Sequence, residues 1–377
     1  MHREQRQRTR ELLKKQGIER ALFAHPESVT WLTGFAPVSE LQSPFQAGPH
    51  LVWYDGGSFT LITQDFQAPY AGDYAHEPDG GLILYEGYAV EHPIRSTADM
   101  AGQLAGLMRG SRGSGAVGVE IDSVSTRQFH ALNLGLNMPE IKAIDHWLKP
   151  LRMIKTGEEI AKLRRAFELT DIAFDAARGM VKPGITEIEV WSAAHSAIQN
   201  TDGLRSPLGN DCVVSYREFN VGGLPAKNVL HEGDSIIIDL SARHQGYWSD
   251  GCRVFYANEP TSEQKERHHF VENALDYAIS LIKPGAKAKD VDAAVRAFVE
   301  RGGYPVYPHH TGHSLGTGMH EEPRIVPYND MTIEAGMVIL LEPATYVFGE
   351  SACRIEDGLI VQADGVEILS YFPRRSF

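Results

Sequence analysis

The first 150 residues consist of short apolar runs separated by polar stretches. A helix is predicted around Arg8–Gln16. Strands are predicted at five apolar runs, namely Ala21–Ala24, Leu51–Tyr54, Thr60–Thr63, Leu82–Tyr85 and Ala116–Glu120. Runs of this length, bounded by turn residues, are typical of buried strands. Between Gly34 and Pro49 the chain is rich in Pro, Ser and Gly, which predicts a loop. This half therefore predicts an α/β domain covering residues 1–150.

After residue 150 the pattern changes to longer helical segments. Thr156 and Glu159 form a capping-box pattern, and apolar residues then follow at helical spacing. This helix is expected to end before the turn Lys182–Gly184, whose sequence is K-P-G. A second capping box, Thr186 with Glu189, opens the next predicted helix. We therefore place a second domain at residues 151–377.

The second domain repeats its own pattern. The segment Val181–Gly184 recurs as Ile282–Gly285, at an offset of 283 − 182 = 101 residues. The segment Gly233–Asp239 resembles Gly336–Glu342, at an offset of 342 − 239 = 103 residues. Each copy reads as a helix, a K-P-G turn, a second helix and a β-rich section. Two separate segments share nearly one offset, which favours an internal duplication over a chance similarity of amphipathic segments.

Each copy ends an apolar strand with a carboxylate. Asp239 follows the run I-I-I, and Glu342 follows the run I-L-L. A lone acid at such a position most often belongs to a salt bridge, because an unpaired buried carboxylate is costly. Here a second acid follows each, Asp250 and Glu356, and a turn between them would bring each pair together. Four converging carboxylates repel one another, and two divalent cations would balance their formal charge of −4. The two turns expected are Arg243–Gly246 and a turn near Gly349.

A histidine cluster lies between the two acid pairs. Four histidines fall within twelve residues, namely His309, His310, His313 and His320. Glycines interrupt this segment, and glycine lets the backbone approach a site closely. One isolated histidine is more often an ordinary residue with satisfied hydrogen bonds. The clustering favours a metal or catalytic site.

Composition narrows the classes of partner. The net charge of −13 repels phosphate backbones, which argues against a nucleic-acid partner. No apolar run approaches the roughly 20 residues of a membrane helix, and the polar N-terminus does not resemble a secretory signal. We therefore expect a cytoplasmic protein without a membrane partner. Cys212, Cys252 and Cys353 form no C-x-x-C pair and are expected to be core-filling thiols.

These residues resemble the pita-bread metallopeptidases, a family that includes methionine aminopeptidase, Xaa-Pro aminopeptidase, prolidase and the metal-free enzyme creatinase. The resemblance covers about residues 10–375, including Leu151–Thr156 at the start of the catalytic domain. Val29–Phe35 is similar to the creatinase-type N-terminal domain, which favours the prolidase, Xaa-Pro aminopeptidase and creatinase branch. The expected fold is this α/β domain followed by an α+β pita-bread domain with pseudo-twofold duplication. The family's metal ligands, in the order Asp, Asp, His, Glu, Glu, are matched by Asp239, Asp250, His313, Glu342 and Glu356.

The resemblance also implies roles. Asp250 and Glu356 would bridge two divalent metal ions, Asp239 would hold one, and His313 with Glu342 would hold the other. Mn²⁺, Co²⁺ or Fe²⁺ suits such oxygen-rich ligands best, with Zn²⁺ as a further option. A water activated by the metals would be the nucleophile, and Glu342 is the candidate general base. The remaining candidate catalytic residues are His309 and His320, which would contact substrate and assist proton transfer, and Arg354, which would pair with a bridging acid or with a substrate carboxylate.

The chain departs from the family at one position. In this branch a histidine precedes the first ligand Asp by 17 residues, and here position 222 is glycine. Its absence weakens the expectation of ordinary Xaa-Pro cleavage. The preceding stretch contains Tyr216 and Arg217, which either shape a specialised substrate pocket or lie on a surface loop.

The leading function is therefore a dinuclear-metal hydrolase of a C–N bond, similar to Xaa-Pro dipeptidases and aminopeptidases, acting on a short peptide or small molecule. A second reading is a non-peptidase metalloenzyme on the same scaffold, such as a small-amide hydrolase or a dimethylsulfoniopropionate lyase. A third is a binding module that has lost the metal. A homodimer is expected from the resemblance, with the loop around Leu41–His50 as the candidate contact.

Overall fold

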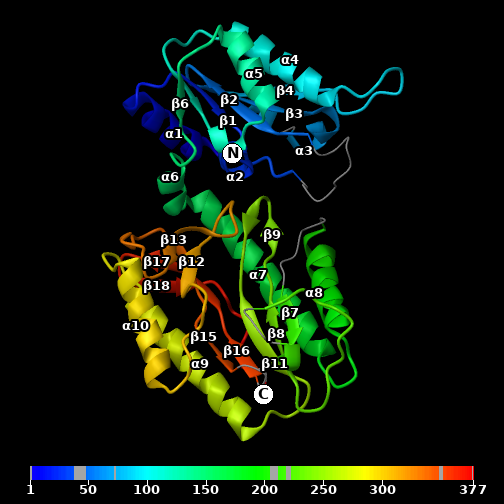
Figure 1. Cartoon of the computed structure of the whole chain (residues 1–377), viewed down its shortest axis with the longest axis vertical. Coiled ribbons are helices and arrows are strands. Elements are labelled where there is room, and N and C mark those ends of the chain that lie inside the picture. Colours follow the sequence, from blue (N-terminus) through cyan, green and yellow to red (C-terminus); the bar gives the residue numbers. More distant parts are fainter. Residues whose placement is uncertain are drawn as a thin grey trace. The chain divides into compact units, whose positions relative to one another are not determined.

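In the computed structural model of the chain, the described residues are 2–37, 48–71, 74–203, 211–217, 222–347, 351–375 and 377. The chain divides into two compact units, Met1–Arg152 and Met153–Phe377 (Figure 1). Most of the loop expected to contact a partner subunit, Leu41–His50, lies outside the described residues, as does the turn expected near Gly349. Among the described helices, none combines the length and apolar character needed to span a membrane.

The first unit is a six-stranded sheet between two layers of helices (Figure 1). The strand order is β4-β3-β2-β1-β5-β6. The strands are β1 (Arg20–Phe23), β2 (Leu51–Asp55), β3 (Ser58–Gln64), β4 (Gly80–Tyr85), β5 (Val117–Val119) and β6 (Ile141–Ala143). The helices are α1 (Arg3–Lys15), α2 (Pro26–Thr33), α3 (Ala68–Ala71), α4 (Ser96–Arg109), α5 (Thr126–Leu136) and α6 (Lys149–Met153). Three 3₁₀ turns complete it, η1 (Asp65–Gln67), η2 (Tyr74–His76) and η3 (Ile121–Ser123).

Burial on both faces explains the continuous apolar strands of this sheet. In β1, Phe23 packs in the core beneath α1 and α2, whereas Leu22 packs in the core beneath α4 and α5. All five strands predicted in this half are present. Helix α1 begins at Arg3, earlier than predicted, because its first turns bury polar side chains. Arg6 is fully buried and its Nη2 lies 2.7 Å from Asp79 Oδ1, so apolar periodicity could not reveal these turns.

The second unit packs two pairs of helices against two sheets (Figure 1). The helices are α7 (Gly157–Met180), α8 (Glu187–Asp202), α9 (Ser262–Leu281) and α10 (Ala288–Arg301). One sheet, in the order β11-β8-β7, contains β7 (Asp211–Val214), β8 (Ser235–Asp239) and β11 (Cys252–Tyr256). The other, in the order β13-β12-β14-β17-β18, contains β12 (Gly312–Ser314), β13 (Glu321–Ile325), β14 (Val338–Leu341), β17 (Asp357–Gln362) and β18 (Gly365–Ile368). Two short hairpins, β9 (Arg243–His244) with β10 (Tyr247–Trp248) and β15 (Ala344–Val347) with β16 (Ser351–Arg354), and the 3₁₀ turn η4 (Ser215–Arg217) complete the unit.

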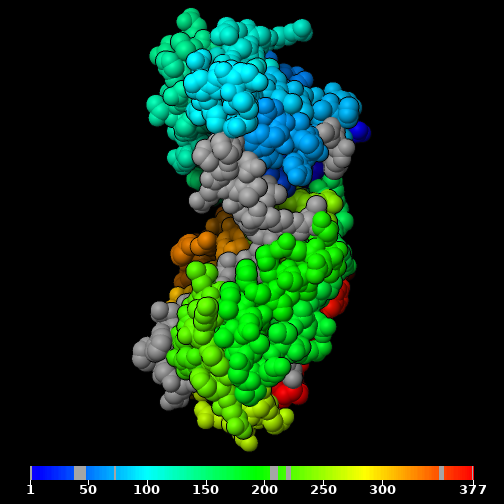
Figure 2. All heavy atoms as spheres, turned by 90° about the vertical axis from the view of Figure 1, so that its right-hand side faces the viewer, coloured from blue at the N-terminus to red at the C-terminus, as the bar shows by residue number. Residues whose placement is uncertain are grey.

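Helix α7 begins and ends where the sequence predicts. The Thr156 N–H donates to Glu159 Oε2 at 2.9 Å, and the Glu159 N–H donates to Thr156 Oγ1 at 3.3 Å, which closes the capping box. The helix ends at Met180, before the K-P-G turn, and α8 follows. Helix α8 forms part of the outer face of this unit and appears in green in Figure 2. These helix limits follow from local capping and turn chemistry alone.

Matching hydrogen bonds confirm the internal duplication. The Gly184 N–H donates to the carbonyl of Leu230 at 2.8 Å, and the Gly285 N–H donates to the carbonyl of Ile333 at 2.9 Å. Both glycines have a positive φ, +91° and +93°, which explains why each K-P-G turn ends in glycine. The acceptor positions are again 103 residues apart. The two halves therefore share backbone geometry as well as sequence.

Candidate metal centre

The first acid pair is brought together by an antiparallel strand pair. Asp239 ends β8, and its Cα partner in β11 is Cys252. The short hairpin β9–β10 lies between them and turns at Gln245 and Gly246, both with positive φ, as the sequence predicts. Asp250 lies just before β11, where its Oδ1 accepts hydrogen bonds from Ser241 Oγ at 2.8 Å and from the Gly251 N–H at 3.0 Å. Both acids therefore stand at the same end of this pair of strands.

The second acid pair is built in the same way and is tied to the first. Leu341 and Asp357 are Cα partners across β14 and β17, so Glu342 and Glu356 flank neighbouring positions. The Glu356 N–H donates to the carbonyl of Cys252 at 3.1 Å, which fixes Glu356 beside β11. The hydrogen bond crosses from one half of the duplication to the other. It is a direct backbone link between the two acid pairs.

Strand β12 carries His313 into this space. Its Nε2 lies 3.4 Å from Asp250 Oδ2 and 3.8 Å from Glu342 Oε1. Its Nδ1 lies 2.8 Å from the carbonyl of Ser314. Because a carbonyl only accepts, Nδ1 carries the proton and Nε2 presents its lone pair to the acids. Burial lowers the pKa of His313, which favours this neutral, ligand-ready form.

The other three histidines lie beside the carboxylate of Glu342 or the ring of His313. His310 Nε2 lies 2.7 Å from Glu342 Oε1, and His309 Nδ1 lies 3.4 Å from Glu342 Oε2. The ring of His320 lies 4.1 Å from that of His313, measured between centroids. Burial lowers the pKa of His309 to about 4, so it is a neutral base near pH 7. The pKa of His320, whose side chain is exposed, is also lowered, by partial desolvation and by the neighbouring rings of His313 and His310. His310 has no role in the sequence-based assignment, although it makes the shortest of these contacts.

The guanidinium of Arg354 contacts three acidic side chains of the centre. Its Nη2 lies 2.7 Å from Asp239 Oδ2 and 3.3 Å from Asp211 Oδ2, and its Nε lies 3.0 Å from Glu356 Oε1. Its Nη1 donates to Tyr346 Oη at 2.9 Å. The side chain is 1% exposed. Of the two roles considered from the sequence, pairing with an acid is the one these contacts favour.

The charges and the hydrogen bonds of this centre fit bound cations. Burial, together with repulsion from neighbouring carboxylates, raises the pKa of Asp239 and Glu356 well above the usual range. Burial raises the pKa of Asp250 to about 7. Burial also opposes the ionisation of Glu342, but the hydrogen bond from His310 and the nearby His309 outweigh it, so its pKa falls to about 2. Among the described residues, buried Glu356 Oε2 accepts no hydrogen bond, which leaves an oxygen available to a metal ion.

A cysteine also lies in this centre. The Sγ of Cys252 is within 4.8 Å of ligand atoms of Asp239 and Glu356. The sequence predicts only a core-filling thiol there, and the residue is fully buried. It lies two residues after Asp250, where β11 begins, and that spacing was the available signal.

Tyr216 and Arg217, the candidate substrate residues, contact other parts of the unit. Arg217 pairs with the carboxylate of Glu187, which is fully buried. Tyr216 is 40% exposed and donates from Oη to the carbonyl of Val229 at 3.1 Å. Residues 218–221, which complete this stretch, lie outside the described ranges. These contacts anchor the segment to Glu187 at the start of α8 and to Val229 ahead of β8.

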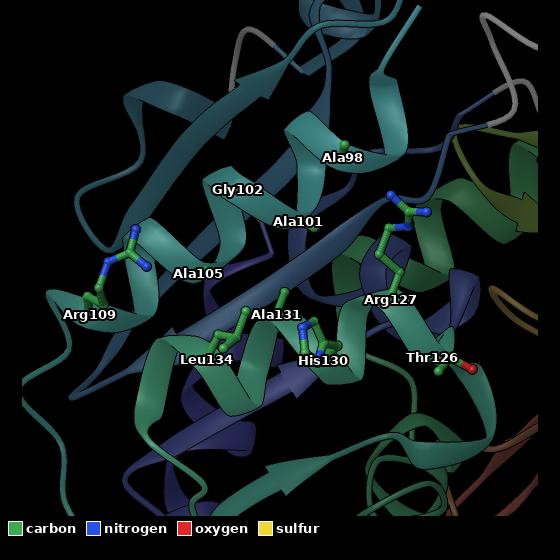
Figure 3. Close-up of a pocket in the computed structure, with 10 residues that line it drawn as sticks. All are labelled: Ala98, Ala101, Gly102, Ala105, Arg109, Thr126, Arg127, His130, Ala131 and Leu134. Atoms are coloured by element: carbon green, nitrogen blue, oxygen red, sulfur yellow. The ribbon is translucent and has the colours of Figure 1, made fainter.

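A separate hollow lies in the first unit, between α4 and α5 (Figure 3). Its volume is about 660 Å³, and small side chains such as Ala98 and Ala105 line it. Arg109, Arg127 and His130 stand around it (Figure 3). It contains no grouping of acids and histidines like that of the second unit, so it is not the candidate catalytic site.

Comparisons with known proteins agree with this architecture. Residues 161–363 match the model of metallopeptidase family M24, and residues 5–154 match that of the creatinase/prolidase N-terminal domain. An uncharacterised peptidase of Staphylococcus aureus strain USA300 is 32% identical over 259 residues, which cover 68% of this chain and 73% of the relative.

Solved structures resemble the whole chain. The Xaa-Pro dipeptidase from Bacillus anthracis is similar with a TM-score of 0.82 and 25% identity, covering 100% of this chain and 99% of that one. The prolidase from Pyrococcus furiosus is similar with a TM-score of 0.78 and 25% identity, covering 97% and 99%. The creatinase-type domain and the pita-bread domain expected from the sequence are thereby confirmed. The chain belongs to the M24 family of metallopeptidases, and this membership implies divalent metal ions.

Proposed function

We propose that this protein is a dinuclear-metal hydrolase that cleaves the C–N bond of short peptides with proline as the second residue. The observation that carries the proposal is the convergence of two acid pairs and one neutral imidazole, from both halves of the duplication. Similarity to an Xaa-Pro dipeptidase and a prolidase over nearly the whole chain supports this substrate class.

The residues that would hold the metal ions are Asp239, Asp250, His313, Glu342 and Glu356. Bound divalent ions would supply Lewis acidity and would lower the pKa of a coordinated water. Mn²⁺, Co²⁺ or Fe²⁺ fits an oxygen-rich set with one imidazole, and Zn²⁺ is the further option. Arg354 would hold Asp239 and Glu356 in place through its contacts of 2.7 Å and 3.0 Å.

The contacts of Glu342 suggest how protons would be transferred. We propose that Glu342 accepts the proton of the attacking water. His309 Nδ1 lies 3.4 Å from Glu342 Oε2 and 2.8 Å from the carbonyl of His310, so it carries a proton and would orient the carboxylate. Burial keeps the pKa of His309 at about 4, so its ring is neutral, and its basic nitrogen is Nε2, which lies 3.0 Å from Tyr346 Oη. His320 stands against the ring of His313, where it would contact the substrate and assist proton transfer.

A panel of Xaa-Pro dipeptides, assayed after reconstitution with Mn²⁺, Co²⁺ or Fe²⁺, tests the proposal. Turnover by the wild type that is lost in Glu342→Gln is the expected result. Loss of a positioned general base costs about 10²–10⁴-fold in rate. Metal content must be measured for both proteins, because Glu342 is also a proposed ligand. Full metal loading without any peptide turnover would contradict the proposed substrate class.

A non-peptidase metalloenzyme is the second candidate, and Gly222 is the observation that favours it. Small amides and dimethylsulfoniopropionate, assayed with the same reconstituted protein, would reveal it. A metal-free binding module is the third candidate, and absence of bound metal after reconstitution would support that reading. We also propose a homodimer, which light scattering after size-exclusion chromatography would test.

A further inference from the structure

Asp211 adds a fifth carboxylate to the candidate centre. It begins β7, and its Cα partner across to β8 is Asp239. Arg354 Nη2 lies between the two acids, 2.7 Å from Asp239 Oδ2 and 3.3 Å from Asp211 Oδ2. The side chain of Asp211 is 23% exposed, so it is accessible from outside, whereas that of Arg354 is 1% exposed. The accessible edge of this part of the centre is therefore acidic.

Gly222 makes room for that carboxylate. A Cβ added at Gly222 would lie 1.7 Å from Asp211 Oδ2 and 2.3 Å from its Cγ. The φ of Gly222 is +154°, a conformation that side-chain-bearing residues rarely adopt. The Cys212 N–H donates to the carbonyl of Gly223 at 3.2 Å, which keeps this segment against β7. The glycine and the acid are thus a matched pair, since any side chain at 222 would displace the carboxylate.

Asp211 changes the charge of the substrate group that this part of the centre would bind. Two divalent cations would balance the four carboxylates of the proposed ligands, which leaves Arg354 as the remaining cation among the described residues of the centre. Without Asp211, that guanidinium would favour a substrate carboxylate. With Asp211, its charge is cancelled, and its other nitrogens already contact Glu356 and Tyr346. The accessible group is then a carboxylate that accepts hydrogen bonds, and the complementary substrate group is an ammonium.

We propose that Asp211, seated against Gly222, is a substrate-binding residue that receives the protonated amino group of the substrate beside the metal centre. This inference rests on the proposed hydrolase function and names the residue that would recognise the amino group of its substrate. A substrate with a free, positively charged amino group is preferred over the same molecule with that nitrogen acylated. Donors on the ammonium would bind the carboxylate through charge-assisted hydrogen bonds.

The test compares Ala-Pro with N-acetyl-Ala-Pro in the Mn²⁺-loaded full chain. Asp211→Asn is expected to reduce the preference for the free amine, measured as a ratio of kcat/KM values, by about 10–100-fold, the range for a hydrogen bond to a charged group. The loss should appear mainly in KM. Asp364→Asn, in an exposed turn, is the matched control and should keep the wild-type ratio. An equal loss for both substrates, with the ratio unchanged, would show a merely structural role and overturn the proposal.

The experiments distinguish failure of the proposed function from failure of this inference. If neither peptide is cleaved, the proposed function fails, and calorimetric Kd values for the two peptides supply the same ratio. A second variant, Gly222→Ala, tests the pairing, because its methyl group would push the carboxylate aside. It should reduce the ratio as Asp211→Asn does, and the double variant should lose no more than either single one. Additive losses would overturn the coupling of the two residues.

Discussion

His310 Nε2 lies 2.7 Å from Glu342 Oε1, within the distance of a charge-assisted hydrogen bond. Glu342 is a proposed metal ligand and the proposed general base, so this contact orients the side chain on which both roles depend. His310 is partly exposed, whereas His313 is buried. The ring therefore reaches Glu342 from the more open side of the centre.

We expect His310→Ala to weaken metal binding by about 10–100-fold, the usual effect of losing a hydrogen-bonding partner of a ligand. Metal titration followed by elemental analysis measures this directly. His231→Ala is the control, since the side chain of His231 is 70% exposed. Unchanged affinity in His310→Ala would mean that Glu342 is oriented by His309 and the backbone alone.

Metal binding is expected to stabilise the second unit. The repulsion among its buried acids is relieved by cations, so Mn²⁺ at 100 times its Kd should add about 2.7 kcal/mol to the free energy of unfolding. Glu356→Gln should reduce this gain, because it removes a charged oxygen that accepts no hydrogen bond among the described residues. Denaturant titrations with and without metal measure the effect, and Glu263→Gln, whose side chain is 77% exposed, is the control. A full gain in Glu356→Gln would argue against Glu356 as a ligand.

A buried ion pair positions the histidine-bearing loop. Lys155 Nζ lies 2.9 Å from Glu321 Oε2, and the two side chains are 1% and 4% exposed. Glu321 Oε1 also accepts from the Gly318 N–H at 2.9 Å, in the loop between His313 and His320. Lys155→Met is expected to destabilise the unit by about 3–5 kcal/mol, because it leaves a buried carboxylate without this counter-charge.

The double variant Lys155→Met with Glu321→Gln provides the check on this pair. It should recover part of the loss, since the carboxylate of Glu321 is then replaced by a neutral amide. Urea unfolding followed by tryptophan fluorescence compares the three proteins. Equal destabilisation in the single and double variants would indicate a packing defect instead of an uncompensated charge.

Stability should fall at mildly acidic pH because of His268. Its Nε2 lies 2.9 Å from the carbonyl of Arg374 and its Nδ1 lies 3.1 Å from Tyr256 Oη, which satisfies the neutral ring. Burial lowers the pKa of His268 below its ordinary value of 6.5. Below pH 6.5, His268 therefore binds a proton in the unfolded chain but stays neutral in the folded chain. The stability that the folded chain has above pH 6.5 is lost as the pH falls towards the lowered pKa of His268.

His268→Gln should flatten this dependence. The slope of unfolding free energy between pH 7 and pH 5 should decrease by up to about 1.4 kcal/mol per pH unit, the value for one proton. Urea titrations across that range measure the slope. His231→Gln should retain the wild-type slope, because its side chain is exposed. Identical slopes in all three proteins would exclude His268 as the responsible group.

Local chemistry in the sequence determined much of this protein. The capping box at Thr156 and Glu159, the K-P-G turns and the apolar strands of the first unit depend on neighbouring residues, so pattern alone located them. The duplication was visible because both copies retain turn residues with the same backbone requirement. The ligand set was inferred from a family resemblance carried by residue order, and both the set and the individual roles are proposals.

The tertiary structure decided what lies beside what. The sequence separates Asp211 from Arg354 by 143 residues, and only the packing of β7 beside β8 places their side chains 3.3 Å apart. The sequence showed that Gly222 stands where the family has a histidine. It could not show that the missing side chain leaves the space that Asp211 occupies. The sequence identified His310 as a member of the histidine cluster. It could not show that its ring is the one nearest Glu342. Such contacts are set by strand pairing and side-chain direction across long loops, which no local periodicity encodes.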